Sequence, residues 1–468
     1  MNTIWFPDLS DGSGPKYLRL VAAIQQAIED GQIAGGERLP PVRDLAWKLK
    51  VTPGTVARAY SRLTDAGLLQ AAVGRGTFVA EPATARQYTP GAMSQIAPAT
   101  PSQSETVDLR SSLLPDMGQE ALIRRCYADM AQQPDPALLH YPGAATGQGV
   151  RVAAARWLQG SQAGRFEAED VVLAHGGQHA IMLVLQCILQ EPNPTVFTED
   201  LTYAGFRHAA RLLRARVVGL QCDSAGVRPD ALAAACREHG PQVFCTSPEV
   251  HNPTAGHTGL ARRKELADVA RHFGCPVLED SCYRNPDSGL PGYRTLLPDL
   301  GWYVTSLSKI ISPALRVGFV LAPSGKIRAL RSAAQFNSFG LSVPVCSLTE
   351  RLLASPDFDR LCGAIRDRVK IYVQTAVNIL GLFELNWQDG VPFLWLKLPR
   401  GWRASAFCRA AEALGIRLRS ADDFSLIDGR APHAIRIAVN GMVELERFEW
   451  AMRQLEHLLS HPPEQIEV

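Results

Sequence analysis

A polar segment that contains four prolines divides this chain and limits how its parts can fold. Residues 81–105 have the sequence EPATARQYTPGAMSQIAPATPSQSE, in which Ala, Ser, Thr and Gln dominate. The segment lacks a sustained apolar periodicity, so it cannot bury enough surface to offset the entropy lost on ordering. We therefore predict a linker at 81–105, which separates a domain at 1–80 from a larger domain at 106–468.

The larger region alternates short apolar runs with longer helical stretches. The runs are VVLAH, PTVFTED, QVFCTS, PVLED and WYVTSLS, each typical of a buried strand. Strands that alternate with helices predict an α/β domain with a mostly parallel sheet. The most apolar run, residues 180–189, is half the length of the ~20 residues that a membrane span needs, so we interpret it as a buried helix.

Composition excludes some classes of protein. The formal net charge is only +2, so any signal for nucleic-acid binding must be local. The first residues lack the basic-then-apolar order of a secretory signal. The ten cysteines form no CxxC pair, which argues against a zinc site or a redox pair. We expect a cytoplasmic protein with reduced cysteines, no metal site and no membrane partner.

The first eighty residues carry the pattern of a helix-turn-helix followed by a β-hairpin. Apolar residues at helical spacing predict one helix over 17–28 and a second over 42–49. Thr52 is a good N-cap, and Pro53 suits the first turn of a third helix. Two short strands around Gly74 would then form a hairpin wing.

Positive charge gathers in the same stretch. Between Arg38 and Gly76 there are seven basic and two acidic residues, a local charge of +5. Such a patch is the electrostatic footprint of phosphate binding, although charge clusters are often only solvated surface. The basic residues are Arg38, Arg43, Lys48, Lys50, Arg58, Arg62 and Arg75. Together with the helix pair and the wing, they predict a domain that binds DNA.

Residues 15–80 resemble the GntR family of bacterial regulators, through GERLPPVRDLAWKLKVTPGTVARAYSRLTDAGLL and GRGTFV. The resemblance implies that four side chains face double-stranded DNA: Arg43, Thr52, Thr55 and Arg58. It also implies that Gly74 and Arg75 reach the minor groove or the backbone. Pro53-Gly54 departs from the family, whose members often carry Ser and then Arg or Asn at this point.

The strongest chemical signal in the larger region is TSLSKIISPALRVGFV. Lys309 follows an apolar strand over 302–305, and most lysines in such an SxxK pattern are only solvated surface charges. A lysine that is desolvated beside a cation, however, loses its proton more readily and can form a Schiff base. Ser306, Ser308 and Arg316 would hold a phosphate group nearby.

Four weaker signals accompany this lysine. Asp280 ends the strand in PVLEDSCYRNP, where it would either accept a hydrogen bond from a pyridinium N–H or cap the next loop. Tyr283 and Asn252 would donate to a ring oxygen, although the Asn-Pro of SPEVHNPTAG is also a common plain turn. Gly177 and Gln178, in VVLAHGGQHAIMLVL, would offer amides to a phosphate at a helix start or form a mere connection. In TEDLTYAGF the tyrosine, Tyr203, would stack on a cofactor ring or belong to the core.

In their order, these elements resemble the fold-type I, aspartate-aminotransferase-like superfamily over residues 106–460. The chain keeps the order of functional elements that the family has. These are a glycine turn, a stacking aromatic, an asparagine, an aspartate, a lysine and an arginine, at residues 177, 203, 252, 280, 309 and 316. The resemblance implies pyridoxal 5′-phosphate as cofactor, with Lys309 as the catalytic lysine. It implies that Arg436 binds a substrate or effector carboxylate and that Tyr141 reaches the site of a second subunit in a homodimer. The segment His175-Gly176-Gly177 departs from the family pattern, because many relatives have a small hydroxyl residue there.

A GntR-like reader fused to such a domain resembles the MocR subfamily. That resemblance implies a transcription regulator that senses pyridoxal phosphate, or an amine or amino acid that displaces Lys309 from the cofactor. The alternative is a working aminotransferase with a secondary role in DNA binding, because every residue that amine exchange requires is present. A cofactor-free dimerisation scaffold conflicts with the intact lysine, aspartate and arginine set. An enzyme does not need the basic DNA-binding domain, and this favours a role in regulation.

Overall fold

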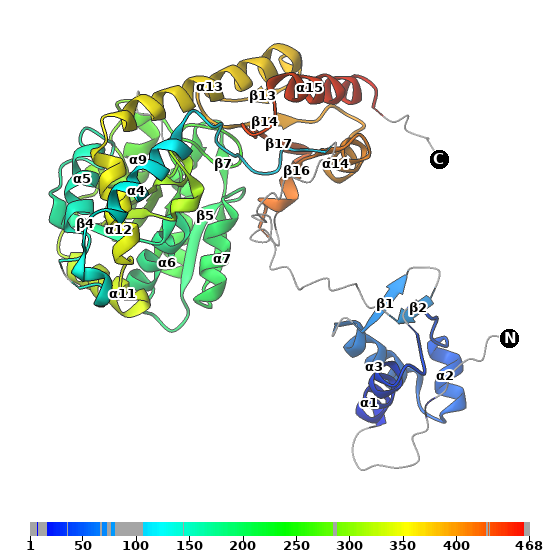
Figure 1. Cartoon of the computed structure of the whole chain (residues 1–468). Helices are drawn as coiled ribbons and strands as arrows, with labels where there is room; N and C mark the ends of the chain where they lie inside the picture. The colour runs from blue at the N-terminus through cyan, green and yellow to red at the C-terminus, as the bar shows by residue number, and fades with distance from the viewer. Residues whose placement is uncertain are drawn as a thin grey trace. The chain divides into compact units, whose positions relative to one another are not determined.

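The computed structural model describes most of the chain and is drawn in Figure 1. The described residues are 7, 16–34, 36–65, 68–72, 76–79, 106–143, 145–283, 288–426, 429 and 431–462. They belong to two compact units, one within Met1–Ala97 and one within Pro98–Val468. The predicted linker at 81–105 lies outside the described residues, so its boundaries stay a prediction. Among the described helices, none is long and apolar enough to cross a membrane.

The first unit is a winged helix-turn-helix, as predicted. Its elements are α1 (Lys16–Glu29), α2 (Val42–Lys48), α3 (Pro53–Asp65), β1 (Leu69–Ala72) and β2 (Gly76–Val79). The two strands pair antiparallel, with Leu69 opposite Val79, and both of these side chains are buried. The predicted cap is present, because Thr52 Oγ1 accepts a hydrogen bond from the Thr55 amide at 3.3 Å. This bond satisfies one of the amides that the start of a helix otherwise leaves unpaired.

The second unit is built on a seven-stranded sheet that is mostly parallel, which confirms the predicted α/β class. In spatial order the strands are β4 (Val171–Ala174), β12 (Gly318–Leu321), β11 (Gly301–Ser306), β10 (Val277–Asp280), β9 (Val243–Thr246), β5 (Thr195–Glu199) and β6 (Arg216–Leu220). Only β12 runs antiparallel to its neighbours. The predicted apolar runs all lie in this sheet.

Side chains alternate between two cores, one on each face of this sheet. Trp302 belongs to one core and Tyr303 to the opposite one, as the two-residue period of a strand requires. The first face is covered by α6 (Gly176–Ile188), α7 (Ala204–Leu212) and α11 (Ile327–Ser338). The opposite face is covered by α4 (Gln119–Ala131), α5 (Gln148–Leu158), α8 (Pro229–His239), α9 (Leu260–Phe273), α10 (Tyr293–Leu296) and α12 (Val343–Ala354). The apolar run at 180–189 lies in α6, so the predicted buried helix is confirmed.

A smaller antiparallel sheet forms the other half of this unit. Its strands, in spatial order, are β13 (Leu385–Asn386), β14 (Phe393–Lys397), β17 (Ala434–Ala438) and β16 (Arg419–Ser420). Its core also receives α13 (Asp357–Leu380), α14 (Ala404–Ala413) and α15 (Leu445–Ser460), together with the strand pair β3 (Val107–Asp108) and β15 (Ile416–Arg417). The long helix α13 joins the two halves (Figure 1), since Phe358 packs in the core of the large sheet and Val373 in that of the small one.

A fully buried glutamate lies on β10, beside the strand-end aspartate. Glu279 accepts hydrogen bonds from the Tyr293 amide at 2.6 Å and from Ser281 Oγ at 3.0 Å. Burial raises its pKa from the ordinary 4.5 to about 7, because the charged form is desolvated. Glu279 therefore holds a proton in the folded protein at pH values where the unfolded chain has released it.

Replacing Glu279 with Gln should stabilise the protein at pH 8. Between the ordinary and the raised pKa the folded state binds more protons, so the glutamate makes stability fall as pH rises from 4.5 to about 7. Gln does not titrate, so the variant avoids the cost of a charged carboxylate in the core. The gain in the free energy of unfolding at pH 8 should reach about 3 kcal/mol at most. The check is the unfolding temperature of both proteins from pH 5 to pH 8, with the exposed Glu384→Gln as control. A gain that is the same at both pH values would contradict the prediction.

Candidate cofactor and effector site

The predicted cofactor residues gather at one edge of the large sheet. Asp280 ends β10, while Lys309 follows β11 by one short turn and Gly176 follows β4. These three strands point the same way, so their carboxyl ends share an edge. This edge is where open α/β sheets bind their ligands.

The turn into α6 and the segment after β11 form a cradle for an anion. Gly176 has φ +80°, and a Cβ at this position would lie 2.8 Å from Arg316 Nη2. Arg316 donates to the His175 carbonyl at 3.4 Å, so its guanidinium lies over the start of the helix. Ser308 Oγ is buried without a partner among the described residues. Free amides, an arginine and an unsatisfied hydroxyl fit a phosphate group.

A buried carboxylate lies deeper in the same site. Asp280 is 8% exposed and accepts a hydrogen bond from the Cys282 amide at 2.9 Å. Burial raises the pKa of Asp280, since desolvation penalises its charged form. A protonated ring nitrogen would give this carboxylate the charged donor that stabilises it, as the predicted role requires.

Lys309 is held by Ser112, which also contacts Tyr283. Its Nζ donates to Ser112 Oγ at 3.3 Å and to the Ser112 carbonyl at 3.4 Å. Ser112 Oγ in turn lies 2.8 Å from the Tyr283 hydroxyl, and the lysine nitrogen is 5.6 Å from the centroid of the tyrosine ring. Ser112 was not predicted from the sequence, because it lies in no motif and 197 residues from the lysine.

The predicted carboxylate-binding arginine contacts the predicted asparagine. Arg436, on β17, donates from Nη1 to Asn252 Oδ1 at 2.7 Å and from Nη2 to the Arg110 carbonyl at 2.7 Å. Its Nε is buried without a partner among the described residues. Burial lowers the pKa of Arg436 to about 10. A cationic side chain with an unused donor in a dry site is suited to bind a carboxylate.

Two more predicted residues meet beside this cluster. Tyr203 donates to Gln178 Oε1 at 3.2 Å, and Gln178 Nε2 donates to the Gly205 carbonyl at 2.9 Å. Burial raises the pKa of Tyr203, so its hydroxyl stays a donor. Ser306 is fully buried at the end of β11. The structure thus brings together the predicted site residues of the large unit, apart from Tyr141.

Tyr141 lies apart from the other predicted residues within this chain. Its side chain is 85% exposed, and its ring centroid is 5.8 Å from that of Phe339. The large aliphatic side chains of Leu138 and Leu139 beside it are also exposed, as is Phe336. We refer to these exposed residues together as the aromatic patch: Leu138, Leu139, Tyr141, Phe336 and Phe339.

The predicted DNA-binding side chains that the structure describes lie on α2, on α3 and at the cap of α3. Thr52 and Thr55 share a hydrogen bond between their hydroxyls at 2.9 Å, and Arg43 is exposed on α2. The Arg58 guanidinium lies 4.4 Å from the centroid of the Tyr17 ring, which restrains an otherwise exposed side chain. The predicted contacts Gly74 and Arg75 lie outside the described residues.

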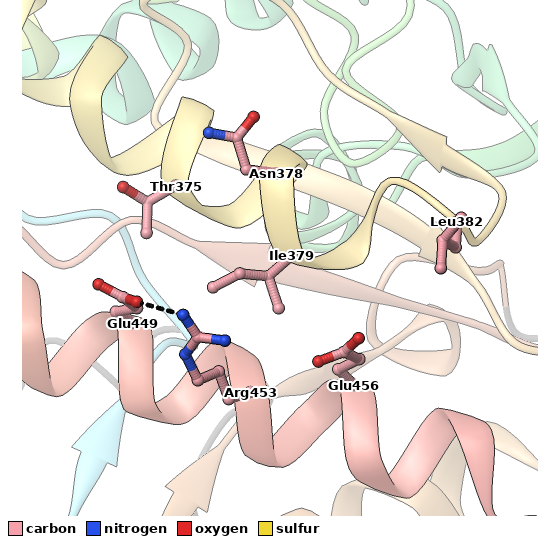
Figure 2. Close-up of a pocket in the computed structure, with 7 residues that line it drawn as sticks. All are labelled: Thr375, Asn378, Ile379, Leu382, Glu449, Arg453 and Glu456. Atoms are coloured by element: carbon pink, nitrogen blue, oxygen red, sulfur yellow. Dashed lines mark hydrogen bonds and ion pairs between the residues drawn. The ribbon is translucent and has the colours of Figure 1, made fainter.

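A surface groove between α13 and α15 is separate from this site. Figure 2 shows it, with Thr375, Asn378, Ile379 and Leu382 on one side and Glu449, Arg453 and Glu456 on the other. Arg453 is already paired with Glu449 at 2.7 Å. The groove shares no residue with the predicted site, and its walls hold charges of both signs.

Fold and site together define a fold-type I aminotransferase-like domain that is joined to a winged helix-turn-helix. Residues 104–448 match the family described as aminotransferase class I and II, and residues 16–79 match the family of bacterial regulatory proteins, gntR. The chain belongs to the aminotransferase class I and II family. Its added gntR domain gives it the MocR-type architecture that the sequence predicts.

Similar proteins include both regulators and enzymes. The HTH-type transcriptional regulator YdeF of Bacillus subtilis, described as uncharacterized, is 27% identical over 97% of this chain and 96% of its own. The vitamin B6 salvage pathway transcriptional repressor PtsJ of Salmonella typhimurium is 28% identical over 91% and 94%. The α-aminoadipate aminotransferase LysN of Thermus thermophilus has a similar fold, with a TM-score of 0.67 and 23% identity over 76% of this chain and 92% of its own.

Proposed function

We propose that this protein is a cytoplasmic transcription regulator whose large domain binds pyridoxal 5′-phosphate. It responds to the cofactor itself, or to an amine or amino acid that reacts with the cofactor. One observation carries this proposal: the predicted cofactor-binding residues cluster around Lys309, and the same chain has a gntR-type DNA-binding domain. The names of PtsJ and of the pyridoxine biosynthesis regulator PdxR of Corynebacterium glutamicum support it.

Each part of the cofactor has a proposed partner in this site. Gly177, Gln178, Ser306, Ser308 and Arg316 would hold the phosphate, and Tyr203, Asn252, Asp280 and Tyr283 would contact the ring. When bound, the cofactor supplies an electrophilic carbonyl carbon and a ring that withdraws electrons. The chain supplies the amine of Lys309, which the Ser112 hydroxyl and carbonyl hold in place.

The effector would enter between Lys309 and Arg436. The buried guanidinium of Arg436 would bind the carboxylate of the effector, and Lys309 would be the amine that holds the cofactor until the amino group of the effector replaces it. Such an exchange changes the contacts on both halves of the large unit, because Asn252 and Arg436 come from different halves. An effector that prefers one of two conformations in this way shifts the population between them, and so alters DNA binding.

We propose a homodimer on the strength of the aromatic patch. Large apolar side chains at 57–88% exposure are costly on a free surface and mark interaction sites. Tyr141 lies in this patch and would reach the site of the second subunit. Twofold symmetry then presents two DNA-binding units to two related half-sites.

An aminotransferase is the second candidate function. The chain has the lysine, aspartate and arginine that amine transfer requires, and the 2-aminoadipate transaminase of Thermus thermophilus is 30% identical over 52% of this chain and 64% of its own. Turnover with a panel of amino donors and keto acids, measured beside DNA affinity with and without each compound, separates the two. A regulator changes its DNA affinity with little turnover.

Arg58→Ala should weaken binding to DNA that the wild type selects from a random pool. The guanidinium is exposed on the recognition helix and held over Tyr17, so it is ordered before binding. Loss of a base-reading arginine costs about 1–3 kcal/mol. The measurement is the dissociation constant at fixed salt, with Arg124→Ala, which removes an exposed charge from α4, as control. Equal affinity of both variants and the wild type would contradict the prediction.

A further inference from the structure

The thiol of Cys282 connects two parts of the proposed cofactor site. Cys282 follows Asp280 by two residues, and its amide donates to the Asp280 carboxylate at 2.9 Å. Its thiol donates to the same carboxylate and accepts a hydrogen bond from the Ser306 hydroxyl. Asp280 is the proposed partner of the cofactor ring, and Ser306 is one of the proposed phosphate-binding residues. A side chain that no motif signals therefore joins the ring end of the site to its phosphate end.

The sulfur of Cys282 also occupies the space beside Gly177. A Cβ at Gly177 would lie 2.5 Å from Cys282 Sγ, whereas its next neighbour, Ser306 Oγ, would be 3.8 Å away. At 2.5 Å the two atoms overlap, so one of them would have to move. The φ of Gly177 is not positive, so the backbone itself does not require glycine there. The sulfur is therefore what excludes a side chain at position 177.

This contact accounts for the departure from the family at residues 175–177. Many relatives have a small hydroxyl residue in that segment, whereas this chain has none and brings the thiol of Cys282 against it. A second observation points to a ligand at the same place. Ser308 is 8% exposed, and its hydroxyl has no partner among the described residues. A buried hydroxyl of this kind is expected to find a partner, and a phosphate group would supply one.

Burial keeps the Cys282 thiol protonated. It raises the pKa of Cys282, because the thiolate would be desolvated. A thiol that keeps its proton is a hydrogen-bond donor and a poor nucleophile, so this side chain is suited to hold Asp280 and not to react. Its hydrogen bond lowers the pKa of Asp280 and so opposes the effect of burial on that carboxyl.

We propose that Cys282 is a positioning residue of the cofactor site. Its thiol fixes the Asp280 carboxylate, and its sulfur packs against Gly177 at the start of α6, where the phosphate would lie. This inference rests on the proposed function, since it concerns the same cofactor. It adds a residue to which that function assigns no role, and it makes positions 177 and 282 a matched pair.

The test is the affinity of the full-length protein for pyridoxal 5′-phosphate, which is titrated into cofactor-free protein and followed by absorption. Gly177→Ala should weaken binding at least about 20-fold, because the added methyl group collides with the sulfur. Cys282→Ala should weaken it only about threefold, since it removes one weak donor. The double variant should bind within about twofold of Cys282→Ala, because the other neighbours of the methyl group lie at 3.8 Å or more.

Two control variants match these changes. Cys187→Ala removes another partly buried cysteine from α6 and should not restore binding to Gly177→Ala. Gly363→Ala adds a methyl group to α13, where nothing lies within 4 Å, and should leave binding unchanged.

A pH profile separates positioning from the filling of space. In Cys282→Ala the charged form of Asp280 loses a donor, so the acid-side change in the absorption of the bound cofactor should move to higher pH. Cys282→Ser keeps a donor and should stay near the wild type. Other titratable groups within electrostatic range are Cys245 and Tyr203 around Asp280, and Lys309 beside the thiol. Burial raises the pKa of Cys245 and of Tyr203, so both stay uncharged over this range.

Several outcomes would overturn this inference alone. They are a Gly177→Ala protein that binds the cofactor as the wild type does, a double variant as weak as Gly177→Ala, and equal pH profiles of the wild type and Cys282→Ala. Where Gly177→Ala does not fold, a folded double variant supports the pair, and failure of both to fold overturns it. A wild type that binds no cofactor would overturn the proposed function as well.

Discussion

Lys309→Ala should abolish the covalent attachment of pyridoxal phosphate completely. The lysine amine lies within 3.4 Å of the Ser112 carbonyl and beside the proposed phosphate cradle, and it is the amine that the site holds in place. Borohydride reduction should fix the cofactor to the Lys309 peptide of the wild type and to no peptide of the variant. Mass spectrometry of the digested proteins measures this directly.

Two controls accompany this prediction, one for the site of attachment and one for the fold. Lys326→Ala removes an exposed lysine and should leave the reduced adduct intact. An unchanged unfolding temperature of Lys309→Ala without cofactor shows that the fold is kept. Any turnover must also cease in this variant, because amine transfer needs the lysine as the base that moves the proton. An adduct on another lysine, or a wild type that takes up no cofactor, would refute the assignment.

Local signals in the sequence located the parts of this site, because each depends on its own neighbours. Thr52 caps α3 through a bond that spans three residues, and Lys309 follows its strand by three residues. The order of strand ends along the chain is also a local property, and parallel strands bring those ends together. Five separate motifs were thus enough to predict residues that lie at one edge of the large sheet.

The contacts between those parts are not local, and the sequence does not reveal them. Ser112 meets Lys309 across 197 positions, and the Arg110 carbonyl meets Arg436 across 326. Both belong to the segment that follows β3, which has no motif of its own. Only the folded chain shows that this segment completes the surroundings of Lys309 and Arg436.

Arg436→Gln should weaken binding of carboxylate-bearing effectors by on the order of 100-fold or more, since a buried charge pair loses its cation. Its guanidinium is held by Asn252 and the Arg110 carbonyl, and its Nε has no described partner, so a donor is left for the carboxylate. Arg436→Lys keeps the charge but loses the planar guanidinium, so its affinity for these effectors should lie between those of the wild type and Arg436→Gln. A simple amine that lacks a carboxylate should bind all three proteins alike, which shows that the cofactor is still attached.

The same variant separates a regulator from an enzyme. A regulator needs only different affinities for two conformations, so Arg436→Gln should keep its DNA affinity without effector and lose the response to effectors that bear a carboxylate. An enzyme needs the arginine for turnover, and its DNA affinity has no reason to follow amino acids. The measurements are turnover and DNA affinity on the same preparations, with and without each compound. Turnover of many per second in the wild type, with DNA affinity that no amine changes, would make amine transfer the primary function and DNA binding the secondary one.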